Sequence, residues 1–109
     1  MAYDEGQAQM MRDDLADVDG ITERNMFGGI CFMLNGNMLC GVHKGGGMFR
    51  IGKPRYAAAL EVPGAAPLSF TGRKMGGMVD ASDLALNDDA NRAALLALAL
   101  TNARALPAK

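Results

Sequence analysis

The sequence of 109 residues predicts a single α+β domain, residues 1–109, with an antiparallel sheet of about five strands and helices at both ends. Two observations carry this prediction. The segments follow the order helix, three strands, helix, two strands, helix, and short links between consecutive strands favour antiparallel pairing. In addition, Asn35-Gly36 between two apolar runs is a strong hairpin signal, because a type I′ turn needs positive φ at both central residues.

The first predicted element is a helix over residues 4–18. Asp4 is suited to its N-cap and Gly20 to the position just beyond its end. Apolar residues recur at spacings of three and four and form one face: Ala8, Met11, Leu15 and Val18.

A β-hairpin follows, with strands at 29–34 and 37–43. A two-residue loop would place Cys31 opposite Cys40 in this hairpin. Pleating then predicts one face composed of Cys31, Met33, Met38, Cys40 and Val42. The other predicted face is composed of Ile30, Phe32, Leu34 and Leu39.

Both faces of this hairpin are apolar, whereas an antiparallel sheet with one wet face alternates apolar and polar residues. Each face must therefore be covered by helices of the same chain, by a second copy of the chain, or by another protein. The predicted helices are too few to cover five strands twice. We therefore expect a homodimer or a protein partner on one apolar face of the sheet.

The remaining elements are shorter, except for the last. A third strand at 48–51 follows the Gly45-Gly46-Gly47 turn, and Pro54 begins a short helix that contains residues 56–60. Two more strands are predicted at 68–70 and 75–79. The final helix, rich in Ala and Leu, begins at a cap provided by Asn87 or Asp88 and stops before Pro107.

Cys31 and Cys40 would form a non-hydrogen-bonded pair in the predicted register, and such pairs bring side chains closest. One interpretation is a reversible redox pair, and the other is two buried, reduced thiols that pack as small hydrophobic groups. No CxxC motif or nearby histidine completes a tetrahedral ligand set. We therefore expect neither a metal nor another cofactor.

Charge is divided unevenly along the chain, although the net charge is only −1. Residues 1–20 hold six acidic residues and one arginine, and residues 43–74 hold six basic residues and one glutamate. The two blocks could pair within one chain or between subunits, or the basic block could contact an anionic partner such as nucleic acid. The candidate contact residues are Lys44, Arg50, Lys53, Arg55, Arg73 and Lys74.

Other function classes leave no signature in the sequence. No secretion signal and no apolar run of about 18 residues is present, so we expect a cytoplasmic protein. The patterns GxSxG, HExxH and GxxxxGK[ST] are absent as well. His43, the single histidine, lies at a predicted strand end beside Lys44. We expect no enzymatic activity.

The run 26–38, which begins Met26-Phe27-Gly28-Gly29 and includes Asn35-Gly36, resembles the signature of the TfoX N-terminal domain family. The resemblance extends over nearly the whole chain. It implies a two-layer fold like that of secretion chaperones, in the order α-β3-α-β2-α. Full-length members regulate bacterial competence for DNA uptake and carry a second, C-terminal domain without a counterpart in this sequence. The family supplies no catalytic residues to carry over.

From these features we expect a small regulatory or protein-interaction module of the TfoX N-terminal type. The alternative is an accessory protein in transcription or competence regulation that binds nucleic acid through the basic segment 44–74.

Overall fold

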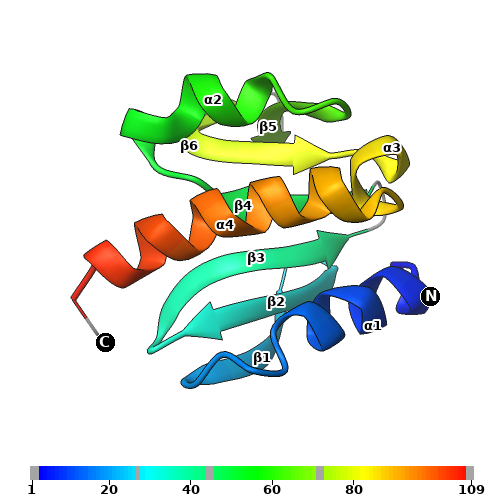
Figure 1. Cartoon of the computed structure of the whole chain (residues 1–109), viewed down its shortest axis with the longest axis vertical. Coiled ribbons are helices and arrows are strands. Elements are labelled where there is room, and N and C mark those ends of the chain that lie inside the picture. The colour runs from blue at the N-terminus through cyan, green and yellow to red at the C-terminus, as the bar shows by residue number, and fades with distance from the viewer. Residues whose placement is uncertain (1–2, 27, 44–45, 71–72, 108–109) are drawn as a thin grey trace.

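The structure is a computed structural model that describes residues 3–26, 28–43, 46–70 and 73–107 (Figure 1). Within these ranges, the side chains at 26, 68–70 and 73–76 are outside the description. The helices are α1 (Glu5–Asp14), η1 (Lys53–Arg55), α2 (Tyr56–Leu60), α3 (Asp83–Leu86) and α4 (Asp89–Ala105). The strands are β1 (Ile21–Met26), β2 (Gly29–Leu34), β3 (Asn37–His43), β4 (Gly46–Arg50), β5 (Ala65–Phe70) and β6 (Arg73–Ala81).

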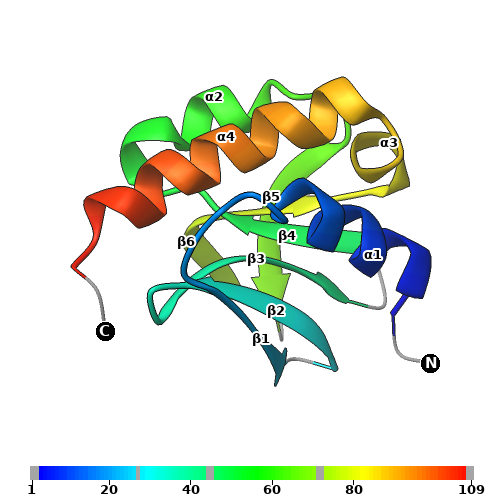
Figure 2. The ribbon, with the colours of Figure 1, turned by 60° about the horizontal axis from the view of Figure 1, so that its bottom comes forward.

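The six strands of the described residues form one antiparallel sheet in the order β1-β2-β3-β4-β6-β5. The helices lie together on one side of this sheet, with α4 packed over β3 and β4 (Figures 1 and 2). The predicted α+β class and the expected two layers are therefore confirmed. The predicted count of about five strands was one too low, because β1 was not anticipated.

Most predicted elements are present, with shifted boundaries. The N-cap of α1 is Asp4, whose carboxylate accepts a hydrogen bond from the Gln7 amide at 3.1 Å. This helix ends at Asp14, short of the predicted residue 18. Asp88 is the N-cap of α4 and accepts from the Asn91 amide at 2.9 Å. The short helix α3 just before it was not predicted.

The hairpin turn is as predicted, but its register is not. Asn35 and Gly36 both have positive φ, 51° and 86°, as a type I′ turn requires. Beyond the pair Met33–Met38 the register shifts, so that the next residue of β2 lies opposite Cys40. Leu39 is thus the extra residue of a β-bulge, and every later residue of β3 faces the side opposite to the one predicted.

The two faces of the sheet consequently divide differently from the prediction. On the helix side, Cys40 and Val42 join Phe32, Leu34 and Leu39 in the main core, which the helices cover. On the other side lies a second cluster, which we call the sulfur cluster: Cys31, Met33, Met48 and Met78, with Met38 packed against it.

The sulfur cluster is already buried within the single chain. Its four main side chains are only 0–8% exposed. The β5–β6 hairpin turns to this side, away from the helices (Figure 2). The hairpin bends at a bulge, where β6 has four residues between Lys74 and Val79. Strand β5 has only one residue between the partners of these two, Ser69 and Pro67. Gly77 in this bulge has φ of 79°. Burying this face therefore requires no second copy of the chain.

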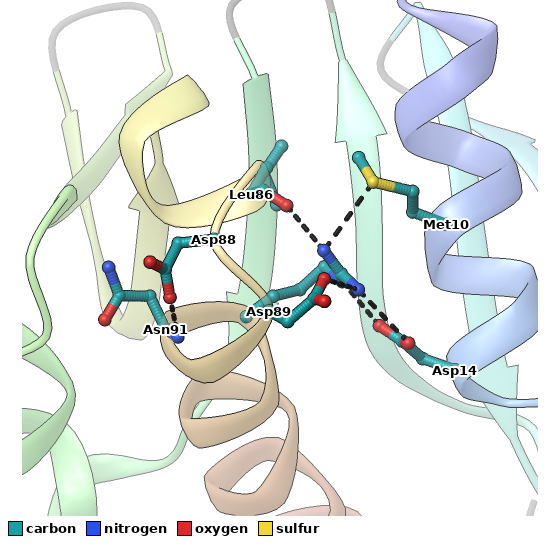
Figure 3. A network of polar contacts seen from close by, with 7 residues as sticks. Met10, Asp14, Leu86, Asp88, Asp89 and Asn91 are labelled. Atoms are coloured by element: carbon teal, nitrogen blue, oxygen red, sulfur yellow. Dashed lines mark hydrogen bonds and ion pairs between the residues drawn. The ribbon is translucent and has the colours of Figure 1, made fainter.

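A polar network joins the two terminal helices (Figure 3). The Arg92 guanidinium donates to Asp14 of α1 through Nε at 2.6 Å and to the Leu86 carbonyl through Nη1 at 2.8 Å. It also donates to Asp89 at 3.0 Å, and the Met10 sulfur lies 3.6 Å from Nη1. These contacts hold α1 against the start of α4 and the end of α3.

Among the helices of the described residues, none combines the length and the apolar character that crossing a membrane requires.

Candidate functional site

The two cysteines do not form the predicted pair. Cys31 lies opposite Gly41, and Cys40 lies opposite Phe32, so the two thiols project from opposite faces of the sheet. Both are free and buried, and burial raises the pKa of each thiol above its ordinary value. A disulfide between side chains that point apart would require the backbone to move. The redox-pair interpretation is therefore wrong for this fold. The reason is the bulge at Leu39, which turns Cys40 to the face opposite Cys31.

The predicted basic set is only partly described. Lys44 lies outside the described residues, and so do the side chains of Arg73 and Lys74 in β6. The side chain of Arg50 is on the face of the sulfur cluster, because Phe49 before it faces the helices. Lys53 and Arg55 follow in η1, beyond the end of β4. Of the six residues, the structure therefore places the side chain of Arg50 in β4 and two residues in η1.

The aromatic residues near this basic segment are also not placed for stacking on bases. Phe49 is fully buried in the main core, and Tyr56 packs partly buried against the same core. The side chain of Phe70 is outside the description. Since single-stranded nucleic acid is bound by basic grooves with exposed aromatic platforms, the described residues do not favour this alternative.

The N-terminal block, residues 1–20, forms its ion pairs with residues outside the basic segment. The Arg12 guanidinium donates twice to Glu23 of β1, at 2.7 and 2.8 Å. Arg92 binds Asp14 in the network described above. Among the ion pairs of the described residues, none joins the 1–20 block to the 43–74 segment.

His43 makes a side-chain hydrogen-bond contact on the face of the sulfur cluster. Its Nε2 lies 2.8 Å from Oδ1 of Asp80, which belongs to β6. Strand β4 lies between β3 and β6, and its residue opposite His43 is Gly46. Because glycine has no side chain, the imidazole can pass over the backbone of β4 toward Asp80. In the described residues, no group of three or more His, Cys, Asp or Glu side chains could hold a metal ion.

The most distinctive surface is the outer edge of β1, which the sequence did not predict. This strand pairs with β2 on one side only, from Ile21 opposite Leu34 to Met26 opposite Gly29. The Asn35 amide donates to the Gly20 carbonyl at 3.0 Å, which makes Ile21–Leu34 a non-hydrogen-bonded pair.

Backbone groups along this edge then alternate in direction. The N–H and C=O groups of residues 22 and 24 point toward β2, whereas those of Ile21, Glu23 and Asn25 point away from the sheet. Among the described residues no other strand lies on that outer side. Three residues of β1 therefore offer their backbone groups to an additional strand.

Each face of the sheet has a hollow in this region, between α1 and β2 on the helix side and against β1 on the other side. The one on the helix side measures about 240 Å³ and is lined by Tyr3, Glu5, Ala8, Gln9, Arg12 and Ile30. The one that reaches the opposite face measures about 540 Å³ and is lined by Thr22, Glu23, Arg24, Met33 and Gly36. Side chains of a strand added to β1 would point alternately to these two faces of the sheet.

Sequence reasoning missed β1 because its pattern is polar on both faces. Residues 22–25 are all exposed, so no apolar alternation marks the strand. The signal that could have found it is spacing. In the sequence, only residues 27 and 28 separate this segment from the first predicted hairpin strand. The segment also begins with the β-branched pair Ile21-Thr22.

Comparison with known proteins gives one match. The sequence model of the TfoX N-terminal domain matches residues 13–103, most of the chain. No curated protein and no solved structure matches the chain.

Proposed function

The chain belongs to the TfoX N-terminal domain family, and we propose that it is a protein-interaction module that binds an extended segment of a partner at the free edge of β1. The observation that carries this proposal is the outward direction of the backbone groups of Ile21, Glu23 and Asn25. In strand addition, such main-chain groups provide affinity, and pockets for alternate side chains provide specificity. The hollow lined by Thr22, Glu23 and Arg24 of β1 is suited to that second role.

As far as its side chains are described, neither face of the sheet offers a comparable surface. The main core lies under the helices, and the sulfur cluster is buried on the other side. Among the described residues, the one large hydrophobic side chain that is clearly exposed is Leu84 of α3, at 64%. A single exposed leucine is common on protein surfaces and indicates no interface.

The opposite edge of the sheet is less able to accept a strand. It is formed by β5, which contains Pro67. Proline has no N–H to donate and is a common protection of edge strands. Strand β1 contains no proline and is therefore the edge that supports the proposal.

A module of this kind acts by binding its partner and catalyses no reaction. One added strand buries a small area, which is typical of weak and reversible contacts in regulation. The two free, buried thiols fit a reducing compartment, and we propose the cytoplasm.

The variant Asn25→Pro tests this function. The Asn25 amide points outward, so proline removes no hydrogen bond to β2 but blocks the addition of a strand. Asn25→Ala is the matched control, because it keeps the amide. The protein is used to select binders from a displayed library of random peptides, and amide exchange is measured at residues 21, 23 and 25.

We expect selected peptides to slow amide exchange at these three residues, to bind the Asn25→Ala control, and to lose binding to Asn25→Pro. Selection of no peptide, or of peptides that bind Asn25→Pro equally well, would overturn the proposed function.

A further inference from the structure

We infer that the segment bound at β1 is an amphipathic strand with basic side chains toward α1 and apolar side chains toward the sulfur-cluster side. This inference rests on the proposed function and concerns the chemistry of the partner. Because successive side chains of a strand point to opposite faces of a sheet, the two sides of β1 can be considered separately.

The helix side of β1 is acidic. Glu5 lines the hollow there together with Ile30, whose partner in β1 is Asn25. At the other end of the strand, the connection from α1 to β1 runs on the helix side of the sheet (Figure 2). Asp17 and Asp19 belong to this connection. All three carboxylates are exposed, and none has a hydrogen-bond or ion-pair partner among the described residues.

The arginine on this side is already neutralised. Arg12 is held by Glu23 through two hydrogen bonds, so the pair carries no net charge toward a partner. An added strand would therefore meet carboxylates near both ends of β1. Lysine or arginine at its helix-side positions would be attracted, and acidic residues would be repelled.

The other side of β1 disfavours basic side chains. Arg24 points there, because it lies opposite Cys31 of the sulfur cluster, and it has no polar partner among the described residues. The hollow on this side is lined by Thr22, Glu23, Arg24, Met33 and Gly36. Its apolar part is Met33, whose thioether adapts to varied apolar groups. Basic side chains are disfavoured next to Arg24, whereas apolar ones can fill the hollow beside Met33.

A second copy of the chain fits this edge poorly. If two β1 strands paired about a two-fold axis, residues opposite each other would have to share a face of the sheet. The two longest registers of this kind place Glu23 opposite Glu23 or Arg24 opposite Arg24. Like charges directly opposite each other destabilise a strand pair, so a partner of different sequence is favoured.

Synthetic peptides test the charge preference. Three short, blocked peptides alternate valine with lysine, with glutamine or with glutamate, and their affinities are measured by calorimetry with the wild-type protein. We expect the lysine peptide to bind at least about tenfold more tightly than the glutamate peptide at low salt, with the preference decreasing as salt screens the carboxylates. A peptide that alternates lysine with threonine, which has nearly the shape of valine but is polar, should bind more weakly if the side near Met33 is apolar.

Protein variants locate the effect. Glu5→Gln and Asp19→Asn should each reduce the preference for lysine over glutamine and leave the affinity of the glutamine peptide unchanged. Glu61→Gln removes an exposed carboxylate from the C-cap of α2 and serves as the control, with no expected change.

The outcomes separate the two proposals. If the peptides slow amide exchange at β1 with equal affinity whatever their charge, the inferred partner chemistry is wrong while strand addition stands. If the lysine peptide binds but Asn25→Pro does not affect it, the basic partner contacts another surface and the inference is also wrong. If no peptide slows exchange at β1 and none is selected from the library, the proposed function fails.

Discussion

Arg92 and Asp14 lie 78 residues apart in the sequence, yet Nε of Arg92 donates to Oδ2 of Asp14 at 2.6 Å. The Arg92 side chain is 9% exposed, and that of Asp14 is 27% exposed. The contact joins the end of α1 to the first turns of α4 (Figure 3). It positions α1, which lines the helix-side hollow together with Ile30 of β2.

We expect Arg92→Met to lower the free energy of unfolding by about 2 kcal/mol, because Asp14 and the Leu86 carbonyl lose a charged donor. Arg104→Met in the same helix is the control. Arg104 is exposed in the last turn, where its interaction with the helix end contributes less than about 1 kcal/mol. Urea denaturation measures both variants, and equal losses would contradict a special role for Arg92.

Glu23 predicts a small dependence of stability on pH. The hydrogen bonds from Arg12 hold the pKa of Glu23 below its ordinary value of 4.5. The pair therefore stabilises the folded state above that value, and this contribution disappears as the pH falls through the lowered pKa.

The expected contribution is small, because side-chain exposures of 40% and 39% leave the pair screened by solvent. We expect Glu23→Gln to cost about 0.5 kcal/mol at neutral pH and less in acid. Urea denaturation of both proteins at several pH values measures the difference. A cost that stays constant from neutral to strongly acidic pH would show that the charge of Glu23 is not its source.

We expect no disulfide between Cys31 and Cys40 in the folded protein. Diamide treatment of the native chain should produce no bond between them, because their side chains lie on opposite faces. Treatment of the unfolded chain is the positive control. Mass spectrometry after alkylation distinguishes the two states, and an intramolecular disulfide in the native sample would refute the observed register.

Gly41→Ala should destabilise the fold more than Gly28→Ala does. A Cβ at Gly41 would lie 2.5 Å from the Ile30 carbonyl oxygen and 3.0 Å from the Met48 methyl group. A Cβ at Gly28 would meet no atom within 4 Å, although φ of 74° there strains an alanine by about 1 kcal/mol. We expect a loss of about 3 kcal/mol for Gly41→Ala. Thermal unfolding of the two variants tests the order.

Local signals in the sequence were sufficient for several elements. Asn35-Gly36 marks the hairpin because both φ angles of its turn are positive, and this requirement depends on two residues alone. Asp4 and Asp88 mark helix starts because a cap is a contact between residues three apart in the chain. The same logic holds for the short helix that follows Pro54.

The remaining features depend on residues far apart in the sequence. The bulge at Leu39 turns Cys40 to the helix side, and no local rule distinguishes the shifted register from the regular one, since both faces of the hairpin are apolar. Met48 and Met78 join Cys31 and Met33 only when β4 and β6 pair in the same sheet.

For the candidate site, the sequence alone determined the family signature, the hairpin and the uneven distribution of charge. The tertiary structure decided that residues 21–26 form a strand, because a polar edge strand is defined by the hydrogen bonds of its neighbour and not by an apolar pattern of its own. It also decided which carboxylates of the acidic block are used internally, since Asp14 meets Arg92 only in the folded chain. The pattern of apolar and polar side chains in a sequence indicates which residues are buried. The direction of the free backbone groups along β1, by contrast, is decided only when the sheet assembles.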